Sequence, residues 1–330
     1  MSRPIPIRTT NIRVEQAYPS PVSPTNTTGL VFNPSRYLSQ YTLPRRFTDN
    51  YSLGEELGYG GFGFVFSAMR KADGLLVACK FIFKSKVPAT SWINDRDLGR
   101  CPIEVAVIKN VKHENIIKFI DYFDDTLLCY CITEIHGTSW SDDLPDIDIA
   151  EFGHNRRRVA MDLFECIEKY ESFTEPAARY IFKQILKAVV HLHQAGLVHR
   201  DIKDENILID DQFRVKLIDF GSAQFFDRSG RKKFNTFLGT KQYASPEILM
   251  QREYVGPEAE VWALGCCLYI ILTGAVPFSS AEQALLKPYS RPNKQLSEAC
   301  LTLLNRMLEK DPRKRATLSE ILSHNWVKTN

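Results

Sequence analysis

Three short motifs carry residues that could bind and transfer a phosphoryl group, and the first is rich in glycine. Gly58, Gly60 and Gly63 lie in the run Gly-Tyr-Gly-Gly-Phe-Gly. Glycines allow backbone amides to approach phosphate oxygens, because no Cβ stands in the way. The next residues, Phe-Val-Phe, predict a strand and not the helix that a dinucleotide-binding fingerprint needs. The run favours a flap between two strands; taken alone, an ordinary hairpin turn is the alternative.

The second motif is a lysine on the following predicted strand. Lys80 ends the run Val-Ala-Cys-Lys, and it shares one face of the strand with Ala78 because alternate side chains point the same way. Its ammonium group could hold the α- and β-phosphates of a nucleotide if a carboxylate positions it. Glu104 on the next predicted helix is the candidate, although an exposed helical carboxylate is the alternative for this residue taken singly.

The third motif is the most specific signal in the chain. Residues 199–206 read His-Arg-Asp-Ile-Lys-Asp-Glu-Asn, and Asp-Phe-Gly follows from Asp219. Asp201 could act as the base for an attacking hydroxyl group, and Lys203 could neutralise charge on the transferred group. Asn206 and Asp219 offer the oxygen ligands that Mg²⁺ prefers. Such a set predicts phosphoryl transfer from ATP without a covalent enzyme intermediate.

These motifs, in this order, resemble those of the eukaryotic protein kinases, and the chain is identified as a member of that family. The resemblance implies an α+β, two-lobed protein-kinase fold, with a small antiparallel β-sheet lobe that holds one key helix and a larger, mainly helical lobe. It also implies ATP and Mg²⁺ as cofactors, with Mn²⁺ as a substitute. Within the family the chain resembles PAS kinase and the PIM kinases, which share the Asp-Ile-Lys-Asp-Glu-Asn run and a tryptophan like Trp92.

The resemblance assigns the adenine pocket as well. Thr133 matches the gatekeeper position, with a buried threonine of a β-sheet as the alternative. Glu134 to His136 match the hinge, whose backbone would meet the adenine. The apolar walls are expected from Val65, Ala78 and Leu208.

Three residues of the predicted helical lobe have expected structural roles. Arg315 is positioned to pair with Glu247 inside the lobe. Glu260 stands where the family commonly has an aspartate that braces the backbone of the catalytic loop. The longer side chain of glutamate must shift to make the same contact.

The resemblance also indicates the substrate. Lys203 in its loop, together with Thr240, is typical of serine/threonine kinases, so we expect protein substrates with Ser or Thr acceptors. Glu205 matches an acid that contacts substrate arginines, and Asp162 with Glu165 could add a second acidic contact. A moderate preference for basic residues upstream of the acceptor is expected.

Regulation of the activation loop has two readings. Arg200 beside Asp201 is the pattern of kinases whose activation loop is held by a phosphate, and Thr236 is the first candidate phosphosite, with Ser229 as the second. The alternative is a loop that is active without phosphate.

Two other functions compete with protein phosphorylation. A pseudokinase scaffold would keep the fold and bind nucleotide and partners without catalysis. The intact set of candidate catalytic and metal-binding residues argues against it: Lys80, Glu104, Asp201, Asn206 and Asp219. A small-molecule kinase of the same fold is disfavoured by Glu247 and Thr240, which belong to the pattern that shapes a groove for peptides.

Patterns of apolar residues predict the elements that position these motifs. Runs rich in β-branched and aromatic residues predict strands at 51–57, 64–69, 75–83, 117–123 and 127–134. A helical pattern over 102–111 places one helix against this sheet. Beyond residue 160 the pattern becomes helical, with helices predicted at 174–196 and, apolar all round, at 261–272.

These elements predict a disordered N-terminal tail followed by one kinase domain. Residues 1–46 are rich in Pro, Ser, Thr and Asn and are expected to stay disordered. The kinase domain is expected at 51–327, with the small lobe at 51–135, the hinge and a polar surface insertion at 136–160, and the large lobe at 161–327.

Composition excludes several classes of protein. The net charge of +3 does not indicate nucleic-acid binding, and no apolar stretch reaches the length of a membrane span. The eight cysteines form no Cys-x-x-Cys pair and most lie in apolar runs, so they are expected to be buried free thiols. We therefore expect a monomer in the cytoplasm, with the nucleus as the alternative, that binds neither membrane nor nucleic acid.

Overall fold

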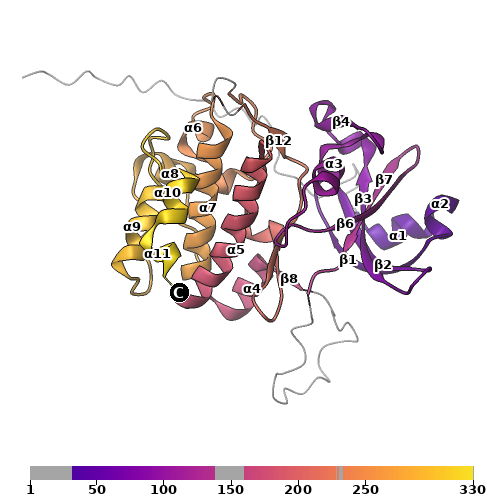
Figure 1. The fold of residues 1–330 in the computed structure, drawn as a ribbon, viewed down its shortest axis with the longest axis horizontal. Helices are drawn as coiled ribbons and strands as arrows, with labels where there is room; N and C mark the ends of the chain where they lie inside the picture. The colour runs from indigo at the N-terminus through magenta and orange to yellow at the C-terminus, as the bar shows by residue number, and fades with distance from the viewer. Residues whose placement is uncertain (1–31, 138–159, 228, 230–232, 330) are drawn as a thin grey trace, which may run out of the picture.

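The computed structural model describes residues 32–329 except 138–159, 228 and 230–232. The predicted insertion at 138–159 lies outside the described residues. The chain forms two lobes, a small β-rich lobe and a larger helical one, which are coloured indigo to purple and pink to yellow in Figure 1. The predicted two-lobed α+β fold is confirmed.

The small lobe is built on an antiparallel sheet of five strands in the order β1-β2-β3-β7-β6. All five predicted strands are confirmed, within a few residues at each end. They are β1 (Tyr51–Tyr59), β2 (Gly63–Arg70), β3 (Leu76–Phe83), β6 (Phe119–Asp124) and β7 (Leu128–Glu134). The predicted helix is α3 (Ile103–Asn110).

The register of the sheet collects the predicted nucleotide-binding residues on one face. Val65 lies opposite Lys80 between β2 and β3, and Ala78 lies opposite Thr133 between β3 and β7. Directly opposed residues point to the same side of a sheet, as do alternate residues of one strand. These four side chains therefore share the face on which Lys80 meets Glu104 of α3.

The other face of the sheet is covered by residues 32–50, the N-terminal segment. The prediction of a disordered tail is wrong for residues 34–46, which contain helix α1 (Pro34–Ser39) and the start of α2 (Arg45–Thr48). The prediction failed because the segment has few apolar residues overall, yet several of them are aromatic rings that pack against the sheet. Tyr37 packs against Phe64 and Phe83, and Phe47 is fully buried among the rings of the strands.

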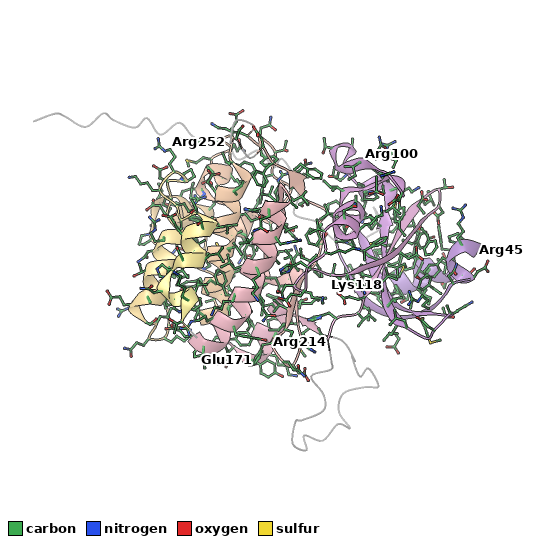
Figure 2. All side chains as sticks on the ribbon, in the orientation of Figure 1. Arg45, Arg100, Lys118, Glu171, Arg214 and Arg252 are labelled. Atoms are coloured by element: carbon green, nitrogen blue, oxygen red, sulfur yellow. The ribbon has the colours of Figure 1, made fainter. Side chains whose placement is uncertain are left out.

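A second element that the sequence did not predict is the hairpin β4 (Trp92–Asp95) and β5 (Gly99–Pro102), which leads directly into α3. Both strands are four residues long, and they carry few of the β-branched residues that mark a strand. Arg100 stacks over the ring of Trp92 at 5.2 Å, and Figure 2 shows its side chain on the outside of this hairpin.

The large lobe consists of helices with short strands at its junction with the small lobe (Figure 1). The strands are β8 (Met161–Asp162), β9 (Leu197–Val198), β10 (Ile207–Ile209), β11 (Val215–Leu217) and β12 (Gln224–Phe225). The helices are α4 (Leu163–Tyr170), α5 (Glu175–Gln194), α6 (Pro246–Leu249), α7 (Gly256–Thr273), α8 (Ala281–Leu286), α9 (Glu298–Met307), α10 (Leu318–Ser323) and α11 (Asn325–Lys328).

Helix α7 is the centre of this lobe, as its apolar sequence predicts, and 16 of its 18 residues are buried. The predicted pair of Arg315 and Glu247 is also confirmed beside it. Two guanidinium nitrogens of Arg315 donate to the two oxygens of Glu247 at 2.8 and 2.9 Å. A third bond runs to the Glu258 carbonyl, and the guanidinium lies over the Trp262 ring. A buried charge that is paired in this bidentate way fixes α6 against α7.

All eight cysteines are buried and free, as predicted. Among the described residues, no helix combines the length and the apolar character needed to cross a membrane.

The aromatic contacts of the N-terminal segment predict that it contributes to stability. Phe47→Ala should lower the free energy of unfolding by about 3–5 kcal/mol, because it removes a fully buried ring and leaves a cavity. Arg45→Ala is the matched control on the same helix, because Arg45 lies at the surface (Figure 2) and should change stability by less than about 0.5 kcal/mol. Chemical denaturation measures both. Equal stability of the two variants would show that the segment is not part of the folded unit.

Candidate active site

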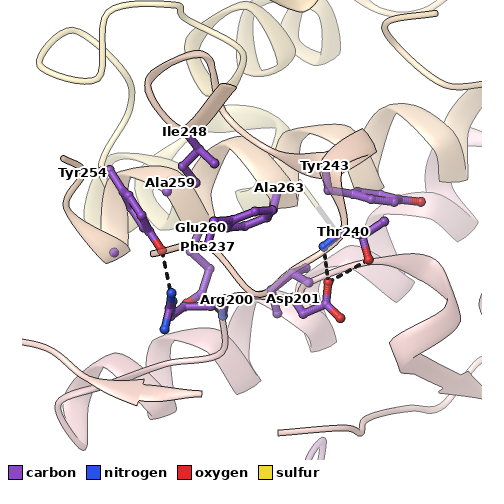
Figure 3. A pocket seen from close by; sticks show the side chains of 12 residues that line it. Arg200, Asp201, Phe237, Thr240, Tyr243, Ile248, Tyr254, Ala259, Glu260 and Ala263 are labelled. Atoms are coloured by element: carbon purple, nitrogen blue, oxygen red, sulfur yellow. Dashed lines mark hydrogen bonds between the residues drawn. The ribbon is translucent and has the colours of Figure 1, made fainter. Parts of the chain in front are cut away.

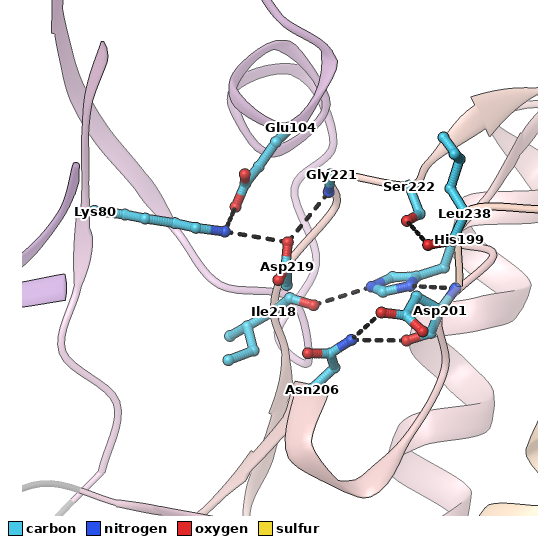
Figure 4. A network of polar contacts seen from close by, with 10 residues as sticks. All are labelled: Lys80, Glu104, His199, Asp201, Asn206, Ile218, Asp219, Gly221, Ser222 and Leu238. Atoms are coloured by element: carbon cyan, nitrogen blue, oxygen red, sulfur yellow. Dashed lines mark hydrogen bonds and ion pairs between the residues drawn. The ribbon is translucent and has the colours of Figure 1, made fainter. Parts of the chain in front are cut away.

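The structure joins the two lobes through three charged side chains. The Lys80 ammonium lies 2.5 Å from Glu104 Oε1 and 3.1 Å from Asp219 Oδ1 (Figure 4). Burial opposes the charge on Lys80, but the carboxylates of Asp219 and Glu104 raise its pKa above the usual value. The ammonium in turn holds the pKa of Asp219 below its usual range, against the effect of burial. Lys80 and Asp219 are therefore both charged at neutral pH.

The glycine run forms the turn between β1 and β2, as the flap interpretation expects. A Cβ added to Gly58 or Gly60 would meet nothing within 4 Å, which leaves open space beside the turn. Gly63 is required for another reason, because a Cβ there would lie 1.8 Å from the carbonyl oxygen of Phe81. The tip of the flap reaches the other lobe, since the ring of Phe62 lies 3.4 Å from the Cβ position of Gly221.

The predicted hinge follows β7 directly. Glu134 binds the small lobe through its backbone amide, which donates to the Lys118 carbonyl, and its carboxylate accepts from Lys216 Nζ at 2.8 Å. His136 is buried, with its Nε2 atom 2.9 Å from the Arg214 carbonyl. Both hinge residues are therefore held by contacts with residues 214 and 216, at strand β11 of the large lobe. Thr133, Val65, Ala78 and Leu208 are all partly exposed.

The carboxylate of Asp201 is held from two sides, by Thr240 (Figure 3) and by Asn206 (Figure 4). Its Oδ1 atom accepts hydrogen bonds from the amide and the hydroxyl of Thr240, at 2.8 and 2.9 Å. Its Oδ2 atom accepts from Asn206 Nδ2 at 3.1 Å, and the same amide donates to the Asp201 carbonyl at 2.8 Å. Because its nitrogen is used by Asp201, Asn206 has its side-chain oxygen left to offer a ligand.

Glu260 braces the catalytic loop in spite of its additional methylene group. Its Oε1 atom accepts from the backbone amides of His199 and Arg200 at 2.7 and 2.9 Å. Its Oε2 atom lies 2.6 Å from His193 Nε2 on α5. Burial raises the pKa of Glu260, but the bond to His193 and the nearby histidines bring it below the usual value. The longer side chain of Glu260 therefore still reaches the backbone of the loop and anchors it through two amides.

The side chain of Lys203 forms an ion pair with Glu205, two residues away. Burial opposes the charge of Lys203, but Glu205 and the nearby Asp201 raise its pKa. Asp162 lies near the same loop, where β8 pairs with β10, and caps α4 by accepting from the Glu165 amide at 2.7 Å. Burial raises the pKa of Asp162 to about 6, and the neighbouring acids Glu165 and Glu205 add to the shift.

Arg200 contacts a backbone carbonyl and two aromatic side chains around the activation loop. The guanidinium group donates to the Thr236 carbonyl and, at 3.1 Å, to the Tyr254 hydroxyl, and it stacks on Phe234 at 4.8 Å. Figure 3 shows the pocket that Arg200, Tyr254 and Thr240 help to line. The side chains of both candidate phosphosites, Thr236 and Ser229, belong to exposed residues. Tyr254 has no sequence signal, because nothing in its spacing links it to the catalytic loop.

The residues present fit a magnesium ion. A carboxylate at Asp219 and an amide oxygen at Asn206 are hard oxygen donors of the kind that Mg²⁺ and Mn²⁺ bind. No group of three or more His, Cys, Asp or Glu residues that could hold a metal occurs in the part of the chain that the structure describes. Waters and the phosphates of a nucleotide would supply the remaining ligands of such a metal.

Comparison with known proteins agrees with this geometry. The protein kinase domain profile matches residues 51–327. The PAS domain-containing serine/threonine-protein kinase of Mus musculus is 38% identical over 84% of this chain and 18% of that protein. The serine/threonine-protein kinase PSK2 of Saccharomyces cerevisiae is 35% identical over 86% of this chain and 24% of its own length. This chain spans about a fifth of the length of these relatives. It belongs to the protein kinase family, and the relatives it matches are serine/threonine kinases.

Proposed function

We propose that this chain is an ATP-dependent protein kinase that transfers the γ-phosphoryl group to serine or threonine hydroxyls, with magnesium as its metal. The observation that carries the proposal is the Asp201 carboxylate, which Thr240 and Asn206 orient. It lies in the same network as the charged pair of Lys80 and Asp219 (Figure 4). This proximity supports a phosphoryl-transfer site at the junction of the two lobes.

Each side chain has a step in this mechanism. Lys80, positioned by Glu104, would bind the α- and β-phosphates. Asp201 would accept a hydrogen bond from the acceptor hydroxyl and align it with the γ-phosphorus. Lys203 would leave Glu205 to neutralise the transferred group. When bound, magnesium would offset the repulsion between the phosphates and the attacking oxygen. Positioning of this kind can lower a barrier by about 7–11 kcal/mol.

Acidic residues beside the catalytic loop support a preference for basic substrates. The side chain of Glu205 is 52% exposed, so an incoming arginine can reach it. Asp162 and Glu165 are neighbouring acids, and together they make the electrostatic potential beside the loop more negative. We propose that these acids contact basic residues upstream of the acceptor. Because the contacts are at the surface, their contribution to binding is moderate.

The contacts of Arg200 favour activity without phosphorylation of the activation loop. A phosphate on a loop acts by giving an arginine new charge-assisted hydrogen bonds. Here Arg200 is only 8% exposed. Its guanidinium group donates hydrogen bonds to the Thr236 carbonyl and the Tyr254 hydroxyl and stacks on the ring of Phe234. We propose that the loop reaches its working conformation through these neutral contacts.

We propose that the chain acts in the cytoplasm, with the nucleus as the alternative, as a monomer that binds neither membrane nor nucleic acid. The net charge of +3 and the burial of all eight free thiols support this proposal.

Removal of the base tests the catalytic proposal. Asp201→Asn should lower kcat by about 100-fold or more, because the acceptor hydroxyl loses its proton acceptor. The affinity for a fluorescent ATP analogue should stay the same, since Asp201 acts on the acceptor. Transfer of labelled phosphate from Mg-ATP to a peptide measures the rate. A wild-type chain that binds the nucleotide but transfers nothing would instead support the pseudokinase alternative.

A pair of peptides tests the basic preference. Glu205→Ala should reduce kcat/KM about threefold to tenfold for a serine peptide with upstream arginines, because a half-exposed ion pair is lost. The same peptide with alanines in place of the arginines is the control, and its kcat/KM should differ little between the two enzymes. An equal loss on both peptides would contradict the proposed contact and point to the bond with Lys203.

Thr236→Ala tests the activation loop. The variant should keep kcat/KM within about twofold of the wild type, because Arg200 binds the carbonyl of this residue and not its side chain. Ser229→Ala, the second candidate, serves as the matched variant. Unphosphorylated protein, checked by mass spectrometry, is required for the measurement. An unphosphorylated wild type that is more than about tenfold less active than the form phosphorylated on Thr236 would show that a phosphate on this residue is needed.

A further inference from the structure

Helix α3 carries Glu104, yet it has little means of holding its own position. It is eight residues long, and isolated helices of this length are not stable in water. Pro102 at its N-cap makes no capping hydrogen bond from a side chain. The position of Glu104 relative to Lys80 must therefore be set by what packs around the helix.

The hairpin β4–β5 holds both ends of this helix. Its second strand, Gly99–Pro102, runs directly into the first residue of α3. The turn between its strands returns to the last residues of the same helix. Asp95, the last residue of β4, accepts a bond from Lys109 Nζ at 2.6 Å and one from Asn110 Nδ2 at 2.9 Å. The hairpin is thus connected to the N-terminal end of the helix by the chain and to its C-terminal end by hydrogen bonds.

The bonds of Asp95 are well protected from water. Its side chain is 7% exposed and that of Lys109 is 16% exposed, whereas Asp97, the second partner of Lys109, is 69% exposed. A sheltered, charge-assisted hydrogen bond contributes more than an exposed one. Positive charge at Lys109 also suits the C-terminal end of a helix. Hydrogen bonds from Lys109, Asn110 and the turn hold the pKa of Asp95 below its usual range, against burial.

Asp95 has two separable roles. It accepts from the backbone amides of Asp97 and Leu98 at 2.9 and 3.0 Å, which shapes the turn of the hairpin. It also binds the side chains of Lys109 and Asn110, which belong to the helix. Removal of Lys109 leaves the first role intact and weakens the second, together with the exposed ion pair to Asp97. The two roles can therefore be tested apart.

We propose that Asp95 is a positioning residue, which holds α3 through Lys109 and Asn110 so that Glu104 stays beside Lys80. The inference rests on the proposed function, because it concerns how the same site is kept ready. According to this proposal, the position of α3 is set by contacts with the hairpin inside the small lobe. It does not depend on a phosphate on the activation loop.

Two variants and one control measure this role. Asp95→Ala and Lys109→Met should each raise the dissociation constant for a fluorescent ATP analogue and lower kcat/KM by about tenfold, the change expected when one charge-assisted hydrogen bond no longer favours the working position. Lys109→Arg should restore most of the loss. Asp73→Ala is the control, because Asp73 also accepts from a turn amide and pairs with Arg70 in the same lobe, but it does not touch α3.

A double-mutant cycle separates positioning from simple destabilisation. In a Glu104→Gln background, Asp95→Ala should cause no further loss of nucleotide affinity, because it acts through Glu104. Additive losses, or a loss equal to that of Asp73→Ala, would overturn the proposal. Thermal unfolding confirms that each variant is folded at the assay temperature. Because nucleotide binding needs no phosphoryl transfer, the cycle is informative even if the wild type proves inactive, an outcome that would overturn only the proposed function.

Discussion

One ammonium group shared between two carboxylates connects the parts of this molecule that bind and transfer phosphate. Lys80 comes from the sheet, Glu104 from the helix beside it and Asp219 from the other lobe. A buried charge is costly unless it is paired, so each partner is stabilised only where the other two are in place. The positions of β3, α3 and the Asp-Phe-Gly motif thus become mutually dependent, and this dependence links the two lobes.

The sequence predicted the parts of the fold that follow a simple period or a specific motif. Strands β1 to β3 were recognised from short β-prone runs, and α7 from a sequence that is apolar all round. The N-terminal segment was missed because its buried rings, such as Phe47, are separated by Pro, Ser and Arg, and their partners lie far along the chain. The hairpin around Asp95 was missed because four-residue strands give too few residues for a period to appear.

The candidate site shows the same division. Motif residues such as Asp201 and Asn206 were found because they lie within a few residues of one another, and their contact is local. Tyr254, which binds Arg200, and His193, which binds Glu260, come from other elements and have no fixed spacing to the motif. Single-sequence reasoning names the groups that do chemistry better than the groups that hold them, because support is supplied by tertiary contacts.

The placement of the cysteines has a practical consequence. Cys79, Cys101, Cys129 and Cys131 lie in the small lobe, and Cys166, Cys266, Cys267 and Cys300 lie in the large one, all buried. Burial also raises the pKa of the Cys266 thiol to about 12, so the reactive thiolate is scarce in the native state. An alkylating reagent can therefore modify the folded chain only after a lobe opens. Each lobe contains four thiols, so the masses of the alkylated peptides show which of the two lobes has opened.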